Sequence, residues 1–254
     1  MKLRSKKQPL QYLLDSCSMQ GRRQSQEDAF LITRGPFGDI IGLVADGVGG
    51  YAHGEFASQT VKDVFENTFA QMDQFDSVES YIRKTMYVAV TMLMQRSMGD
   101  SSYKEACTTV SGFIITRKNL LYVFNVGDSR VYRFRNSELE RLTVDHSYVQ
   151  ELIDSGRISE DAAFDHPDKN EVTNVLCSSL TGLRIDVETV GEVMQGDLIL
   201  ASTDGVHDYI RDSEIQSFIA GYKGNESLAK ALCELAYERR SYDNITAITC
   251  QRII

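Results

Sequence analysis

The feature that most constrains the fold of this chain is how closely its β-rich segments follow one another. Segments rich in Val, Ile, Phe and Tyr occur at residues 40–45, 110–116, 120–126, 130–135, 186–190, 197–202 and 245–250. Arg117-Lys118-Asn119 separates the second from the third, and Gly127-Asp128-Ser129 separates the third from the fourth. A parallel crossover needs a dozen or more residues, so each of these two pairs is predicted to be antiparallel.

Helical periodicity lies between and after these segments. Apolar residues recur at spacings of three and four after Gly54, and further helices are predicted over residues 80–98 and 227–239. Four methionines on the second helix are predicted to fill the core: Met86, Met92, Met94 and Met98. Strands, two helices, many strands and then helices again indicate antiparallel sheets covered by helices, an α+β layered domain, in preference to an alternating βαβ fold.

The domain organisation is predicted from the prolines, linkers and repeats in the sequence. The 254 residues contain three prolines, with no linker-like stretch and no repeat of fixed period, which favours one domain over residues 19–254. Residues 1–18 are predicted to be a basic tail or a first strand. Residues 145–180 are more polar, with short helical pieces at 148–155 and 159–164, and are predicted to be a flap lying over the main body.

The net charge and the cysteine pattern indicate which partners and which cellular compartment to expect. The formal net charge is −9, which disfavours a nucleic-acid-binding surface. No apolar run approaches the roughly 18 to 20 residues of a membrane span. The five cysteines are odd in number, scattered and free of any CxxC pair, which predicts free thiols in a reducing compartment. We therefore expect a cytoplasmic protein without a membrane segment.

Acidic residues recur at the ends of the predicted strands. Asp46-Gly47 and Asp204-Gly205 each follow an apolar strand, Asp128 ends another, and Asp243-Asn244 precedes the last one. Gln26-Glu27-Asp28 adds a further acidic element near the start. A single Asp-Gly is most often a turn, but carboxylates that converge at one sheet edge repel each other unless cations neutralise them. Oxygen donors without clustered His or Cys favour Mg²⁺ or Mn²⁺.

The glycine-rich stretch LVADGVGG at residues 43–50 raises the alternative of a phosphate-binding loop. It lacks the GK[ST] ending of a P-loop, and Asp46 would repel a phosphate unless a cation lay between them. We expect Gly47 to offer its carbonyl to a metal, and Gly49 and Gly50 to permit a close approach to the next helix. Arg23, beside the first acidic element, is placed to bind phosphate oxygens bidentately.

Five motifs in order resemble the protein phosphatase 2C family, the metal-dependent Ser/Thr phosphatases, and in particular its bacterial branch. The resemblance covers residues 19–250 and rests on these segments: RQSQEDA at 23–29, DGVGG at 46–50, VGDSR at 126–130, TDGVHD at 203–208 and DNIT at 243–246. It implies a four-layer α-β-β-α sandwich of two antiparallel sheets flanked by helices, with a flap insertion.

The resemblance also implies a site and a reaction. Two Mn²⁺ or Mg²⁺ ions, with a third in bacterial members, would hold a water that attacks a phosphoserine or phosphothreonine of a protein, without a covalent intermediate. The implied metal ligands are Asp46, which bridges two ions, the Gly47 carbonyl, Asp204, Asp243 and, for the third ion, Asp128. Arg23 would hold the phosphate, with Glu27, Asp28 and Asn244 supporting the ligands and His146, His166 and Asn170 belonging to the flap. Substrates would be targets of a Ser/Thr kinase, and the enzyme a monomer.

The sequence departs from the family pattern at three places, and two other functions are open alternatives. Val48 stands where eukaryotic members carry a His proposed as general acid, Gln26 where bacterial members often have Asn, and Cys177 to Leu180 where a Leu-Gly segment is usual. The alternatives are a catalytically inactive phosphoprotein- or partner-binding regulator of the same fold, and a metal-dependent nuclease. A Ser/His/Asp hydrolase is excluded by the lack of GxSxG, so the four histidines are expected in loops or on the surface, with His146 and His166 the candidates for substrate contact.

Overall fold

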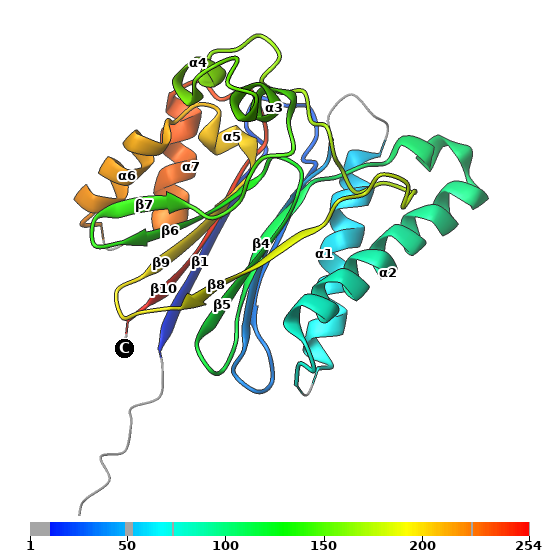
Figure 1. Ribbon diagram of the computed structural model, residues 1–254, viewed down its shortest axis with the longest axis horizontal. Helices are drawn as coiled ribbons and strands as arrows, with labels where there is room; N and C mark the ends of the chain where they lie inside the picture. The colour runs from blue at the N-terminus through cyan, green and yellow to red at the C-terminus, as the bar shows by residue number, and fades with distance from the viewer. Residues whose placement is uncertain (1–10, 49–52, 73, 225, 254) are drawn as a thin grey trace, which may run out of the picture.

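Two antiparallel sheets, with ten strands among the residues that the structure describes, form the centre of the molecule. The computed structural model describes residues 11–48, 53–72, 74–224 and 226–253 (Figure 1). The strand orders are β1-β10-β9-β6-β7 and β2-β3-β4-β5-β8, and all neighbours are antiparallel. The strands are β1 Tyr12–Met19, β2 Asp28–Arg34, β3 Ile40–Asp46, β4 Val110–Ile115, β5 Leu120–Val126, β6 Arg130–Arg135, β7 Glu138–Arg141, β8 Asp186–Glu192, β9 Leu198–Ser202 and β10 Ile245–Arg252.

The central strands are buried on both faces, as their mostly apolar sequences require, whereas the edge strands β1, β7 and β8 are partly exposed. In β3, Ile40 and Val44 belong to the core between the sheets, whereas Ile41 and Leu43 point to the opposite face, toward the helices. This alternation is the period of two that a strand imposes on its side chains. The sandwich therefore has an inter-sheet core and one helix-facing core on each side.

Helices cover both outer faces, which confirms the predicted four-layer α+β sandwich. The helical segments are α1 Gly54–Ala70, α2 Val78–Gly99, η1 Ser101–Glu105, α3 Tyr148–Asp154, α4 Glu160–Phe164, α5 Asp204–His207, α6 Asp212–Gly221 and α7 Leu228–Glu238. Figure 1 shows α1 and α2 beside the sheet that contains β4 and β5, and α6 and α7 beside the other sheet. Helix α1 packs on β2 and β3, and α7 packs on β1 and β10.

The expected antiparallel pairing of residues 120–126 with 130–135 is wrong. The pairing of β4 with β5 across Arg117-Lys118-Asn119 is confirmed, but β5 and β6 lie in different sheets. A three-residue link is short enough for either a hairpin or a step between stacked sheets, and the sequence does not distinguish them. The step places Gly127 and Asp128 where the two sheets meet.

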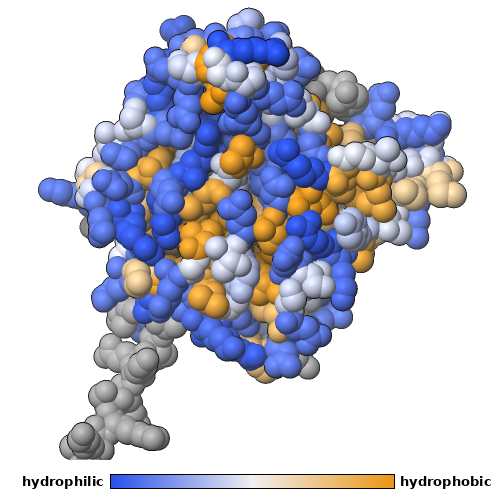
Figure 2. All heavy atoms as spheres, in the orientation of Figure 1, coloured by the Kyte–Doolittle hydropathy of each residue, from blue (hydrophilic) through white to orange (hydrophobic). Residues whose placement is uncertain are grey.

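The methionines of α2 are only partly core residues. Met86 is fully buried, but Met92, Met94 and Met98 are exposed, the last by 82%. The prediction is wrong for these three because α2 is covered on one side only. Figure 2 shows apolar side chains across the middle of this face and toward the side that carries α2. The end that carries the flap is mainly hydrophilic.

The predicted flap region contains α3 and α4, above the strand ends near α5 (Figure 1). Arg211, at the start of α6, binds Asp161 and Asp165 of the flap, each at 2.8 Å. Lys169 binds the Asp208 carboxylate at 3.1 Å. These ion pairs fasten the insertion to the main body. Among the described residues, no helix is both long and apolar enough to cross a bilayer.

Candidate metal-binding site

A cavity of about 390 Å³ opens where the strands of both sheets end. Its walls bring together nine of the residues predicted for the site: Arg23, Glu27, Asp46, Gly47, Asp128, Asn170, Asp204, Asp243 and Asn244. Asp28 lies directly beside them, as the cross-strand partner of Asp46 in the β2–β3 pair. The two flap histidines do not line this cavity, among the lining residues that the structure describes.

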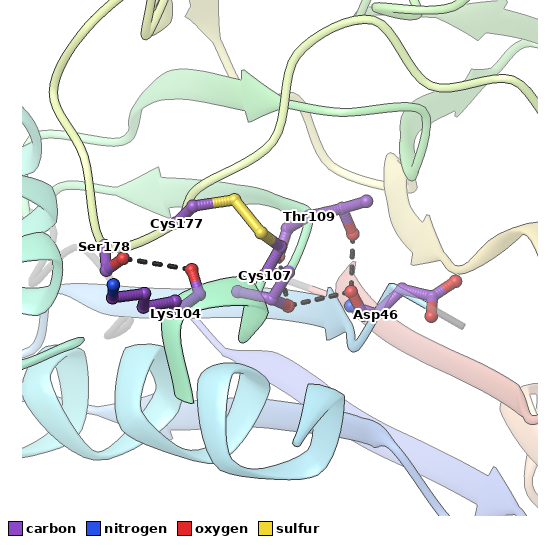
Figure 3. The surroundings of a disulfide bond; sticks show 7 residues. Asp46, Lys104, Cys107, Thr109, Cys177 and Ser178 are labelled. Carbon is purple, nitrogen blue, oxygen red and sulfur yellow. Dashed lines mark hydrogen bonds between the residues drawn. A yellow bond between two sulfur atoms is a disulfide. The ribbon is translucent and has the colours of Figure 1, made fainter. Parts of the chain in front are cut away.

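The backbone of Asp46 is fixed by two threonines. Its N–H donates to Thr109 Oγ1 at 3.1 Å, and its carbonyl accepts from the Thr109 N–H and from Thr108 Oγ1, both at 2.8 Å (Figure 3). The main chain at the end of β3 is thereby held to the strand entering β4. These backbone bonds do not use the carboxylate, and Asp46 lines the cavity.

Gly47 allows the chain to pass close to α1. A Cβ atom at this position would lie 2.5 Å from the carbonyl carbon of Gly54 and 2.9 Å from the Glu27 carbonyl oxygen, closer than real Cβ contacts. The predicted close approach to the next helix therefore occurs at Gly47 itself. Gly49 and Gly50, to which it was assigned, lie outside the described residues.

Asn244, in the last of the five motifs, hydrogen-bonds to the loop that carries the first motif. Its Oδ1 accepts from the Glu27 N–H at 2.8 Å, and its Nδ2 donates to the carbonyls of Gln20 and Ser25 at 2.8 and 2.9 Å. One buried amide thus makes three hydrogen bonds to the loop that carries Arg23. The loop is positioned by a residue more than 200 positions later in the chain.

Arg23 and Asp243 pair with each other across the mouth of the cavity. Arg23 Nη2 lies 2.6 Å from Asp243 Oδ2, and the arginine side chain is 41% exposed. Its pKa is raised, first by the hydrogen bond to Asp243 and also by the charges of Asp204 and Asp46. The guanidinium therefore stays charged at the rim, where an incoming anion would meet it.

Burial and mutual repulsion raise the pKa values of four buried aspartates, Asp28, Asp46, Asp128 and Asp204. Burial is the main cause for Asp46, to which the charges of Asp204 and Asp28 add, and the same combination acts on Asp204, with Asp208 as its strongest repelling neighbour. The pKa of Asp28 is raised to about 7, mainly by burial. Burial, followed by repulsion from Asp145, raises that of Asp128 to about 7. Without added positive charge, this cavity disfavours its own ionised form.

The residues present fit divalent cations. Asp28 Oδ1 and Asp204 Oδ1 are buried and have no hydrogen-bond partner among the described residues, although Thr203 donates to the other oxygen of Asp28 at 2.9 Å. Within the described ranges, no three His, Cys, Asp or Glu side chains are grouped as they are in an all-protein metal cage. Mg²⁺ and its chemical relatives keep several waters and need only one or two carboxylates each, so spread-out aspartates suit them.

The raised pKa values predict how metal-free protein responds to pH. Between about pH 4 and 7, folded Asp28 and Asp128 retain protons that the unfolded chain has released, so stability falls as pH rises through this window. We expect the thermal midpoint of chelator-treated protein to decrease from pH 5 to pH 8. Mn²⁺ should raise the midpoint more at pH 8 than at pH 5.

Asp128→Asn tests the origin of this slope. The variant removes one of the two groups, so its thermal midpoint should change less with pH than that of the wild type over the same window. Equal slopes for the two proteins would contradict the assignment.

Replacement of Asn244 by alanine should weaken both the fold and the site. The change leaves buried amide and carbonyl groups without partners, which costs about 1–3 kcal/mol of unfolding free energy. It also releases the Arg23 loop, and loss of such supporting contacts typically lowers metal affinity or activity about 10- to 100-fold. Urea unfolding and Mn²⁺ titration measure the two effects. Asn67→Ala, an exposed change on α1, should alter neither, and an Asn244→Ala protein equal to this control would refute the role.

The expectation of loop or surface positions is wrong for His207, which is buried in α5, whereas His146 lies in a loop but is also buried. His146 is 2% exposed: its Nε2 lies 2.9 Å from Asp186 Oδ2, and its Nδ1 accepts from the Gly127 N–H at 3.2 Å. Burial lowers its pKa, and the hydrogen bond to Gly127 supports the link that carries Asp128. His207 is also buried, with a pKa lowered by burial. His166 is partly exposed and lies 4.0 Å from Asp168.

The expectation of free thiols throughout is wrong. Cys107 and Cys177 form a disulfide, while Cys17, Cys233 and Cys250 are free. The partners are 70 residues apart, and neither count nor spacing indicates the pairing. Thr109 and Thr203 were missed as well. Thr203 directly precedes Asp204 in the motif, but nothing in the sequence marks Thr109.

The fold and the cavity define a class of protein: an α+β sandwich with an oxygen-rich site for divalent cations between its two sheets. The chain matches the family model described as Protein phosphatase 2C over residues 18–238, and it belongs to that family.

Its similarity to bacterial phosphatases extends over most of the chain. It is 29% identical over 217 residues to Serine/threonine phosphatase stp of Listeria monocytogenes serovar 1/2a, covering 84% of each protein. It is 30% identical over 210 residues to Serine/threonine protein phosphatase PstP of Mycobacterium tuberculosis, covering 81% of this chain and 39% of that protein. The crystal structure of Serine/threonine phosphatase Stp1 from Staphylococcus aureus superimposes with a TM-score of 0.86 at 27% identity, covering 96% of this chain and 95% of that one.

Proposed function

We propose that this protein hydrolyses phosphoserine and phosphothreonine in phosphorylated proteins, with Mn²⁺ or Mg²⁺ as cofactor. The observation that carries the proposal is a cavity in which four aspartates from both sheets face one charged arginine at the rim. Membership of the protein phosphatase 2C family and the Ser/Thr phosphatase names of its relatives support the same activity.

The roles of the aspartates follow the resemblance of their motifs to the protein phosphatase 2C family, and their shared place around one cavity supports them. Asp46 would bridge two cations with the Gly47 carbonyl beside it, Asp204 and Asp243 would complete the first cation, and Asp128 would hold a third. Glu27, Asp28 and Asn244 would support these ligands. When bound, the cations supply an activated water and neutralise charge on the phosphoryl group.

Arg23 orients the substrate in this proposal. Its guanidinium can exchange Asp243 for two phosphoryl oxygens, because both partners are partly exposed at the mouth. Asn170 of the flap lines the same cavity and faces the bound phosphoprotein. Val48 also lines it, and its aliphatic side chain supplies no proton to the leaving group.

The remaining proposals concern the extent of the domain, the oligomeric state, the cellular location and the substrates. We propose that residues 19–254 act as one phosphatase domain, that the protein is monomeric and cytoplasmic, and that its substrates are the products of a Ser/Thr kinase. The net charge of −9 and the acidic cavity favour a protein substrate over nucleic acid. Nothing observed favours the inactive regulator, since all the acidic positions of the five motifs are filled.

A substrate panel tests the proposal. With Mn²⁺ present, we expect phosphate release from phosphoserine and phosphothreonine peptides, and none of the nicking of plasmid DNA that a nuclease would produce. A parallel calorimetric Mn²⁺ titration separates the alternatives. Metal binding without phosphate release would support the inactive regulator, and nicked plasmid without phosphate release would support the nuclease.

A further inference from the structure

The disulfide joins the end of the flap to the strand entry that supports Asp46. Thr108 and Leu176 form an antiparallel bridge, in which each N–H donates to the other's carbonyl, at 3.0 and 2.8 Å. Cys107 and Cys177 are therefore the next facing pair, with Cα atoms 4.4 Å apart, as expected beside a hydrogen-bonded pair. Figure 3 shows the bond between the flap's return segment and the start of β4.

Only a few residues separate this bond from the metal site. The Cys107 carbonyl accepts from the Val48 N–H at 3.0 Å, and the next two residues, Thr108 and Thr109, make the hydrogen bonds that fix the Asp46 backbone. Any movement of residue 107 therefore reaches the backbone on both sides of Gly47.

On the flap side, the same bond limits how far the return segment can leave the body. Ser178 Oγ donates to the Lys104 carbonyl at 3.2 Å, a second and weaker contact between the same two segments. Val172, four residues before Leu176, lines the cavity. The covalent bond and one neighbouring bridge thus hold the flap wall next to the cavity.

The bond is open to thiol chemistry from the flap side. Cys107 is 6% exposed, whereas Cys177 is partly exposed. A dithiol reductant can attack the Cys177 sulfur as a thiolate, and the Cys107 sulfur leaves and takes up a proton. The second thiol of the reductant then displaces the Cys177 sulfur. Two electrons and two protons pass to the protein, and the reductant becomes a disulfide.

We propose that Cys107–Cys177 is a redox-sensitive fastening of the flap, which dithiols open and disulfide oxidants close. Oxidation holds the return segment on the strand that supports Asp46. Reduction leaves the return segment held to the strand entry by hydrogen bonds alone, those of the Thr108–Leu176 bridge and of Ser178 to Lys104. This segment therefore becomes more mobile, while ion pairs still hold α4 and Lys169 to the body, and the cations are held less tightly. The consequence for catalysis rests on the proposed function, but the changes in mobility and metal affinity do not.

Peptide mapping and hydrogen exchange test the proposal. In protein kept from reductants, mass spectrometry should find the Cys107–Cys177 cross-linked peptide and three alkylatable cysteines. Dithiol treatment should speed amide exchange at residues 172–178 and 106–109 roughly tenfold or more, since the cross-link no longer restricts opening. The Mn²⁺ dissociation constant should rise by up to about tenfold.

Matched variants show whether the effect of the dithiol comes from the Cys107–Cys177 bond. Cys250→Ala removes a free buried cysteine of β10 and should respond to dithiol as the wild type does. The Cys107→Ser/Cys177→Ser double variant should exchange rapidly in both conditions. Alkylation of both Cys107 and Cys177 in unreduced wild type, or equal exchange before and after reduction, would overturn the proposal. Faster exchange on reduction in a protein that releases no phosphate would uphold it while refuting the proposed activity.

Discussion

Asp46→Asn should lower kcat/KM for a phosphothreonine peptide by roughly 10³-fold, because contributions of several kcal/mol from bound cations depend on this carboxylate and each 1.36 kcal/mol is tenfold. The fold should be kept, since the hydrogen bonds that fix residue 46 use its backbone. The measurement is steady-state hydrolysis at saturating Mn²⁺.

The same variant should be more stable than the wild type when both lack metal. Burial and the charges of Asp204 and Asp28 oppose ionisation of Asp46, and a neutral amide of similar shape removes that repulsion. The thermal midpoint in chelator should therefore rise while activity is lost. Asp76→Asn, at an exposed position before α2, is the matched control and should change neither property. Retention of full activity by Asp46→Asn would refute the assignment of the site.

Removal of divalent cations should abolish hydrolysis almost completely, by about three orders of magnitude. Asp46, Asp128, Asp204 and Asp243 then leave an acidic cavity that repels a phosphoryl group, with Arg23 bound to Asp243. Activity in chelator, followed by titration with Mn²⁺ or Mg²⁺, measures the loss and its recovery.

Recovery should be accompanied by proton release near neutral pH. Asp28 and Asp128 have pKa values raised to about 7, so bound cations should displace protons from them. Calorimetry in two buffers of different ionisation enthalpy measures that number of protons. Undiminished activity after exhaustive chelation would contradict a metal-dependent mechanism.

The sequence predicts the centre of the sandwich better than its edges. β3, β4, β5 and β10 are rich in apolar and β-branched residues and are mostly buried, so the sequence predicts them as strands. The half-buried β1, with Asp15 and two serines, lacks that signal, so the sequence does not distinguish a tail from a strand there. The step of the chain from one sheet to the other after β5 has the length of a hairpin, which local sequence does not resolve.

The site was predictable where chemistry is concentrated in motifs. Asp46, Asp204 and Asp243 are acidic residues next to apolar strands, and the structure brings them to one cavity. The residues that support these aspartates are harder to predict from the sequence. Thr109 is an ordinary strand-entry residue, and Cys107 meets Cys177 only because tertiary structure aligns Thr108 with Leu176. Roles of this kind depend on contacts between distant segments.

The hydrogen bonds from Asn244 to Gln20 and Ser25 determine when the site can form during biosynthesis. β1 pairs along its length with β10, whose residues are translated more than 200 positions later. A nascent chain that has not yet released β10 from the ribosome lacks the partner of its first strand, as well as Asp243 and Asn244. Such long-range pairing forms late, since the ends of a long segment must first meet. Phosphatase activity should therefore be absent from nascent chains until β10 has emerged from the ribosome.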